Sequence, residues 1–252
     1  MCLIVLAYQK HPRFPFIVAA NRDEYYKRPT ASATFWTEYP DILAGRDLDQ
    51  MGTWLGITKN GRFAAITNYR DPKTTRPDAK SRGQIVRDFL CGNDVPTKFL
   101  QKIDPIREDF NGFNLLVGDT GGLMYYSSRT GKGQELKPGI HGLSNHLLDT
   151  PWPKVVAAKE RMGEALADVE TMCGENLFFL LSDIVVPPDD ELPFTGISLE
   201  WERALAPIFI VSPDYGTRSS TVLLQDCTGH VTFMERTFPE TIDVKYEFDI
   251  QY

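Results

Sequence analysis

The chain has 252 residues, of which 42% are hydrophobic and 24% are charged, the composition of a globular protein long enough to bury a core. Its formal net charge of −7 argues against the basic surface that nucleic-acid binding requires. No run is long and apolar enough to span a membrane, and the four cysteines, which form no CxxC pair, fit reduced thiols in a cytoplasmic protein. We expect a single domain over residues 1–252.

An apolar run over residues 1–8 begins the chain and places a cysteine directly after the initiator methionine. The run lacks the parts of a signal peptide and predicts a buried strand with Cys2 at its exposed tip. Removal of Met1 gives Cys2 a thiol and a free α-amine. The amine titrates near ~8 and the thiol near ~8.5, so the pair is a nucleophile with its own base. The alternative is that Cys2 is a small buried hydrophobe.

The remaining predicted elements are hairpins with helices between them. A second strand covers residues 15–20 and ends at the polar run 21–24, and a linker follows. Asn60-Gly61 joins strands over 53–58 and 62–68, because this dipeptide tolerates positive φ. Ser81 is expected to cap a helix that Gly92 closes. A polar loop over 69–80 precedes that helix, and an acidic, proline-rich loop over 187–193 is a candidate lid. Further helices are expected over residues 95–103, 153–169, 177–182 and 199–205, and further strands over 113–119, 123–127, 140–145 (strand or turn), 208–211, 218–225, 231–237 and 244–250. This order predicts an α+β fold with largely antiparallel sheets covered by helices.

Polar residues stand at the ends of these predicted strands, and together they match the needs of a cysteine amidase. A cation lowers the pKa of a thiol, and amide N–H donors stabilise an oxyanion, each donor contributing about 2.7–4 kcal/mol. A carboxylate orients the α-amine. Each residue also has a purely structural interpretation: Asn68 and Asn145 can be turn residues, and Arg22 and Asp23 can form an ion pair. The candidates are Cys2, Arg22, Asp23, Asn68, Asn145 and Arg218.

The run Asn21-Arg22-Asp23-Glu24 after a strand, with Cys2 at the start, resembles the NRDE family, the relatives of transport and Golgi organisation protein 2. Further stretches similar to the family follow in order from residue 2 to about residue 237. The resemblance implies an N-terminal-nucleophile hydrolase fold, a four-layer αββα sandwich of two largely antiparallel sheets. The stretches are residues 52–56, 67–70, 81–83, 143–145, 151–154 and 215–221.

The chain is more distantly similar to the choloylglycine hydrolase and penicillin V acylase group. This resemblance implies that Cys2 is the nucleophile and, through its amine, the base. It places Arg22 beside the thiolate and Arg218 as a second cation. It implies that Asn68 and Asn145 form the oxyanion hole and orient the α-amine.

The carboxylate departs from the pattern of that group. The group has its aspartate three residues after the arginine, where this chain has Tyr25. Asp23 is therefore our candidate, with Glu24 as the alternative.

The first functional hypothesis is a hydrolase that cleaves the C–N or thioester bond of a small acylated substrate and requires no cofactor. The alternative, implied by the resemblance, is a non-catalytic protein that binds and traffics haem or acyl-CoA and other lipids. Four histidines, at 11, 141, 146 and 230, are possible haem ligands, although no CxxCH motif accompanies them. An interaction module of the secretory pathway is the third hypothesis. We expect no metal site, because His141 and His146 are five residues apart and no HExxH is present.

Overall fold

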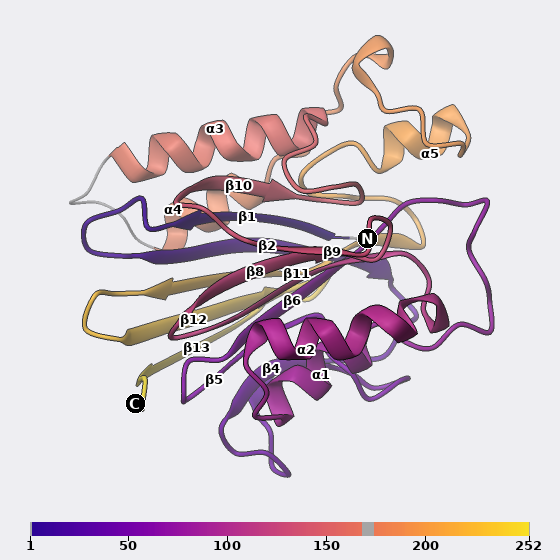
Figure 1. Cartoon of the computed structure of the whole chain (residues 1–252). Coiled ribbons are helices and arrows are strands. Elements are labelled where there is room, and N and C mark those ends of the chain that lie inside the picture. The colour runs from indigo at the N-terminus through magenta and orange to yellow at the C-terminus, as the bar shows by residue number, and fades with distance from the viewer. Residues whose placement is uncertain (1, 168–173, 252) are drawn as a thin grey trace. The chain divides into compact units, whose positions relative to one another are not determined.

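The computed structural model describes residues 2–167 and 174–251, which form two compact units, each with one antiparallel sheet (Figure 1). The first unit contains residues up to 27, residues 137–144 and residues 148–249, and the second contains residues 28–136, 145–147 and those from 250 onward. The predicted α+β class with two antiparallel sheets is confirmed. The single domain over residues 1–252 stays a prediction.

The sheet of the first unit has six strands in the order β10-β1-β2-β11-β12-β13, so β2 lies in its interior between β1 and β11. Helices α3 and α4 pack against the strands β10, β1, β2 and β11. The strands are β1 (Cys2–Tyr8), β2 (Phe16–Tyr25), β10 (Gly139–Leu143), β11 (Tyr215–Gln225), β12 (His230–Thr237) and β13 (Ile242–Asp249), and the helices are α3 (Pro153–Ala167), α4 (Gly174–Leu181), the 3-10 turn Asp189–Glu191 and α5 (Leu199–Ala204).

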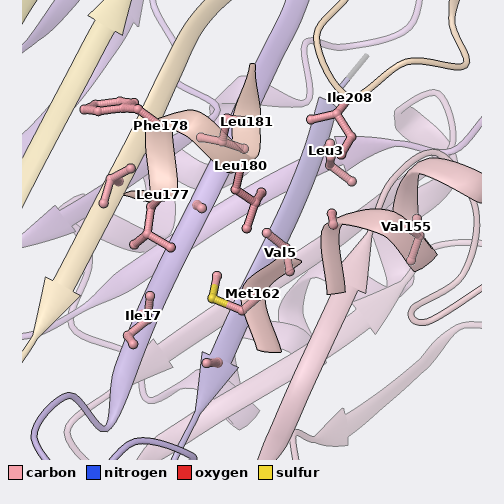
Figure 2. Packing of buried hydrophobic residues seen from close by; sticks show 14 of the residues in the cluster. Leu3, Val5, Ile17, Val155, Met162, Leu177, Phe178, Leu180, Leu181 and Ile208 are labelled. Atoms are coloured by element: carbon pink, nitrogen blue, oxygen red, sulfur yellow. The ribbon is translucent and has the colours of Figure 1, made fainter. Parts of the chain in front are cut away.

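The core of this unit lies between one face of the sheet and these two helices. Figure 2 shows Val5 and Ile17 of the sheet on the side of Met162 and Leu177 of the helices. All four are fully or almost fully buried, and each such side chain contributes about 1.5–3 kcal/mol relative to exposure. Because alternate strand residues share a face, the odd-numbered residues of β1 and β2 face the helices.

The sheet of the second unit has seven strands in sequence order, and helices α1 and α2 pack on it. Phe89, Phe99 and Phe113 belong to its core. The elements are β3 (Thr30–Phe35), β4 (Ile42–Asp47), β5 (Leu55–Thr58), β6 (Phe63–Asn68), α1 (Gly83–Cys91), α2 (Pro96–Ile103), the 3-10 helix Asp104–Asp109, β7 (Phe113–Asp119), β8 (Gly122–Ser127) and β9 (Lys132–Glu135).

The Asn60-Gly61 hairpin is confirmed, with β5 and β6 paired and Gly61 at φ +80°. Three other predictions are wrong. The linker before residue 35 contains β3. Ser81 is not the cap of α1, whose N-cap is Arg82 without a side-chain hydrogen bond. Residues 208–211 form no strand. Their backbone groups are hydrogen-bonded elsewhere: Phe209 N, for example, donates to Asp183 O (2.7 Å).

The helix predicted over residues 153–169 is confirmed to residue 167, and Val169 lies outside the described residues. Within residues 2–167 and 174–251, no helix has the length and apolarity needed to cross a bilayer.

Candidate active site

Cys2 is the first residue of β1 and is partly buried. It pairs directly with Arg22 of β2, and its carbonyl accepts a hydrogen bond from Ser144 Oγ (3.2 Å). Directly paired residues of neighbouring antiparallel strands share a face of the sheet. Cys2 and Arg22 therefore stand side by side on the face opposite α3 and α4.

The polar run 21–24 lies inside β2 and not beyond its end, which corrects the sequence prediction. The strand continues through these residues because β11 pairs with it as far as Tyr25. Consecutive residues point to opposite faces, so Asn21 and Asp23 face the helices and Arg22 does not. This alternation does not favour an ion pair between Arg22 and Asp23.

Asn21 has a structural role that the sequence did not reveal. Its Nδ2 donates to Leu181 O and to Ile208 O, both at 2.9 Å, and its Oδ1 accepts from Ser220 Oγ at 2.6 Å. The side chain is buried. It ties β2 to the end of α4 and to the segment before β11.

Asp23 is buried and closely held by β11. Its Oδ1 accepts from Thr217 Oγ1 (2.8 Å), and its carbonyl accepts from Tyr215 Oη (2.9 Å). Burial raises the pKa of Asp23, against the opposing charge of Lys154 and the hydrogen bond from Thr217. Glu24, in contrast, is only partly buried and accepts from the Tyr25 backbone N–H (2.9 Å). The geometry favours Asp23 over Glu24 as the carboxylate near Cys2.

The protonation state of Cys2 follows from opposing effects. Burial raises the pKa of the Cys2 thiol, and the Asp23 charge adds to this, while the Arg22 charge and the hydrogen bond from the Asp23 backbone N–H lower it. The net direction is upward, so the sulfur rests as a thiol. Arg22 lowers the pKa of the thiol as expected but does not outweigh burial, so a base must take the proton when the sulfur reacts.

Arg218 is the extra residue of a β-bulge in β11. Its NH1 nitrogen donates to the carbonyls of Tyr25 (2.9 Å) and Tyr26 (3.0 Å), and its Nε donates to Phe238 O (3.4 Å). Burial and the charge of Arg22 lower the pKa of Arg218. Arg218 thus lies within electrostatic range of Arg22, while its hydrogen bonds hold the turn after β2.

Asn68 and Asn145 belong to the second unit and lie next to each other. Asn145 is fully buried, its Nδ2 donates to Asn68 O (3.0 Å), and its carbonyl accepts from Arg70 N (2.7 Å). The pair sits at the end of β6, as the sequence predicts for Asn68. Their convergence on Cys2 stays a prediction.

A family model described as Transport and Golgi organisation 2 matches residues 1–240 of this chain. The chain belongs to this family. The transport and Golgi organisation 2 homologue of Mus musculus is 34% identical over 276 residues, and that of Homo sapiens is 34% identical over 277 residues, each match covering 100% of both chains. The protein of Drosophila melanogaster is 28% identical and covers 94% of this chain and 92% of its own.

Solved structures show how this member of the transport and Golgi organisation 2 family folds. Two mutant forms of the conjugated bile acid hydrolase from Clostridium perfringens match it with a TM-score of 0.54 each, at 8% and 9% identity. Each match covers 100% of this chain and 97% of the other. The likeness confirms the predicted N-terminal-nucleophile hydrolase fold.

Two buried residues of this family member were not among the predicted site residues. Lys154, at the start of α3, is buried, donates to Leu205 O (2.8 Å) and acts electrostatically on Asp23. Thr217 is the hydrogen-bond partner of Asp23. Both lie in stretches that resemble the family, but a sequence does not show that a lysine is buried or which carboxylate a threonine contacts.

Proposed function

We propose that this protein is a cysteine hydrolase that cleaves a C–N or thioester bond of a small acylated substrate. The observation that supports it best is the surroundings of Cys2: Arg22 stands in register beside the thiol, and the backbone N–H of Asp23 reaches the sulfur. A cation and an N–H donor at a nucleophile are the groups that stabilise charge developing during acyl transfer.

The proposed reaction starts after removal of Met1 exposes the α-amine of Cys2. The amine takes the proton of the thiol, and the sulfur attacks the substrate carbonyl to form a tetrahedral oxyanion. Collapse breaks the C–N or C–S bond, and the leaving amine or thiol departs with the proton. Water then attacks the acyl-enzyme thioester, which releases a carboxylic acid and restores the thiol.

We propose that Asp23 orients the α-amine, which is supported by its place one residue beyond the partner of Cys2. Its raised pKa makes ionisation depend on positive neighbours, of which Lys154 has the largest effect. We propose that Asn68 and Asn145 supply the oxyanion hole, as the family resemblance implies, and that Arg218 supports Arg22 as the second cation.

The test combines intact mass with thiol labelling of protein made in its native host. A variant in which Cys91, Cys173 and Cys227 are alanine leaves Cys2 as its only cysteine. We expect the mass of a chain without Met1, one iodoacetamide adduct, and an acyl adduct after incubation with a thioester. Retained Met1 together with an unreactive Cys2 would refute the proposal. Substitution of Cys2 by Ala in the same background is the control and abolishes both adducts.

A second function, carriage of an apolar ligand, has the support of a cavity in the first unit. The cavity has a volume of about 510 Å³, within the usual range of small-molecule sites. Eight of its twelve lining residues are apolar, Val156 and Ile208 among them, and the charged ones are Lys154, Glu160, Asp183 and Glu191. This composition suits an acyl chain with a polar end.

Haem fits this cavity less well than an acyl chain does. The residues that line the cavity include no histidine, cysteine or methionine. Both ring nitrogens of His141 are already engaged, with Asp149 Oδ2 (2.7 Å) and Lys137 O (2.9 Å). We therefore propose acyl-CoA or a free fatty acid as the ligand of this alternative.

Titration with palmitoyl-CoA and with haemin separates these possibilities. Val156→Trp narrows the cavity and should abolish binding of the acyl ligand, while Glu164→Trp, an exposed position on the same helix, should leave it unchanged. Equal binding of palmitoyl-CoA by both variants would show that the cavity is not the binding site. The cytoplasm remains our proposed location, supported by the free thiols of Cys2, Cys91 and Cys227.

A further inference from the structure

The bulge in β11 shifts the strand register so that Ser219 lies on the same face of the sheet as Cys2 and Arg22. Thr217 pairs with Asp23, but Ser219 pairs with Arg22, and the residue between them is skipped. Without the bulge, Ser219 would pair with Asn21 and face the helices. Bulges commonly re-aim side chains in this way. Cys2, Arg22 and Ser219 consequently form one row across β1, β2 and β11, on the face away from α3 and α4.

The hydroxyl of Ser219 is buried and, within the part of the chain that the structure describes, has no hydrogen-bond partner. The neighbouring hydroxyls are engaged, since Ser220 Oγ donates to Asn21 Oδ1 (2.6 Å) and Thr217 Oγ1 donates to Asp23 Oδ1 (2.8 Å). Buried hydroxyls of native proteins nearly always have a partner. An unused donor in the row that contains the nucleophile is available to a ligand.

The charge around Ser219 favours an oxygen that carries negative charge. Arg22 is the direct neighbour of Ser219 in the row, and Arg218 lies within electrostatic range of Arg22. Glu235 is buried on the same face two residues further along, where it accepts from Thr221 Oγ1 (3.4 Å), and it offsets part of this charge. The nearest cationic group to Ser219 in the row is the guanidinium of Arg22, and guanidinium groups bind carboxylates through paired N–H groups.

We propose that Ser219 and Arg22 bind a carboxylate of the substrate, so that Cys2 acts on acyl compounds that carry a carboxylate several bonds from the scissile bond. The inference rests on the proposed hydrolase function. Neighbouring strands lie about 4.8 Å apart, which places the backbone of Ser219 roughly 10 Å from that of Cys2. The group at Ser219 is therefore a second group of the substrate and not the carbonyl that the sulfur attacks.

Two alkylating reagents test this in the variant whose only cysteine is Cys2: N-iodoacetyl-β-alanine, which ends in a carboxylate, and N-butyliodoacetamide, which ends in a methyl group. Saturation kinetics separate the binding constant from the maximal alkylation rate. We expect Ser219→Ala to weaken binding of the carboxylate reagent about tenfold to a hundredfold, since hydrogen bonds to charged groups have this strength. The maximal rate and the binding of the butyl reagent should not change.

Ser219→Thr keeps a hydroxyl and should keep the preference for the carboxylate, and Ser220→Ala, whose hydroxyl contacts Asn21, should leave both binding constants unchanged. An equal effect of Ser219→Ala on both reagents, or no effect, would overturn the inference.

Thermal denaturation with glutarate distinguishes this failure from failure of the hydrolase proposal. If Cys2 alkylates with neither reagent, the hydrolase proposal fails. Stabilisation by glutarate of the unsubstituted chain but not of Ser219→Ala still supports the carboxylate site. Equal stabilisation of both, or of neither, overturns it.

Discussion

Substitution of Asn21 by alanine should destabilise the first unit strongly, although Asn21 belongs to the motif that marks the family. The change removes one buried side chain, and three buried groups lose a hydrogen bond: the carbonyls of Leu181 and Ile208 and the hydroxyl of Ser220. An unsatisfied buried polar group costs about 1–3 kcal/mol. We therefore expect a loss of about 3–5 kcal/mol, a large share of the 5–15 kcal/mol that holds a typical protein folded.

Urea denaturation followed by circular dichroism measures this loss. Ser220→Ala removes only one of the three hydrogen bonds and should cost about 1 kcal/mol. Asn21→Asp keeps the acceptor for Ser220 but turns a carboxylate oxygen toward two carbonyls. Burial then favours the protonated acid and raises its folded pKa, so the stability of this variant should fall as the pH rises.

A free energy of unfolding for Asn21→Ala within 1 kcal/mol of the unsubstituted chain would refute this reasoning. The alkylation rate of Cys2 under native conditions gives an independent reading. Asn21 points to the face opposite Cys2, so the rate in the folded variant should be unchanged. A large fall in that rate with little loss of stability would assign Asn21 to the chemistry.

Two further predictions concern β11 and the turn after β10. Gly216→Ala places a Cβ atom 2.7 Å from Ile210 O and should lower the free energy of unfolding by about 1–3 kcal/mol. Gly163→Ala in α3 meets only ordinary contacts and should raise the free energy of unfolding by about 0.5–1 kcal/mol. The reverse order of the two variants in urea denaturation would contradict this. The hydrogen bond that His141 donates to Asp149 raises the pKa of His141, so this pair stabilises the fold below the unfolded pKa of histidine and the gain disappears as pH rises through the folded pKa. The stability difference between the unsubstituted chain and His141→Gln should therefore be larger at pH 5.5 than at pH 9, and an equal difference would argue against the pair.

The elements that could be predicted from sequence are those that local chemistry determines. Gly61 marks its hairpin because the turn needs a positive φ, and Pro153 begins α3 because its ring fits the first helical turn. The apolar run over residues 2–8 forms β1 because it is long enough only for a buried strand. In each case the residues that decide the structure are neighbours in the chain.

The parts that could not be predicted depend on contacts between distant residues. Asn21 donates a hydrogen bond to Ile208 O across 187 positions, and residues 208–211 form no strand despite their apolar pattern. The bulge that brings Ser219 opposite Arg22 depends on the pairing of β11 with β2, and nothing in the residues 215–221 alone marks it. Burial likewise decides that Cys2 rests as a thiol, and a single sequence does not show burial.

The interior position of β2 has a consequence for synthesis on the ribosome. Its hydrogen-bonding partner on one side is β11, which is made about 190 residues later, roughly 10–40 s at ordinary translation rates. Until then an apolar strand edge is open to other nascent chains, and edges of this kind promote aggregation. Premature termination before residue 215 would make that exposure permanent, so truncated products should require chaperones or rapid degradation.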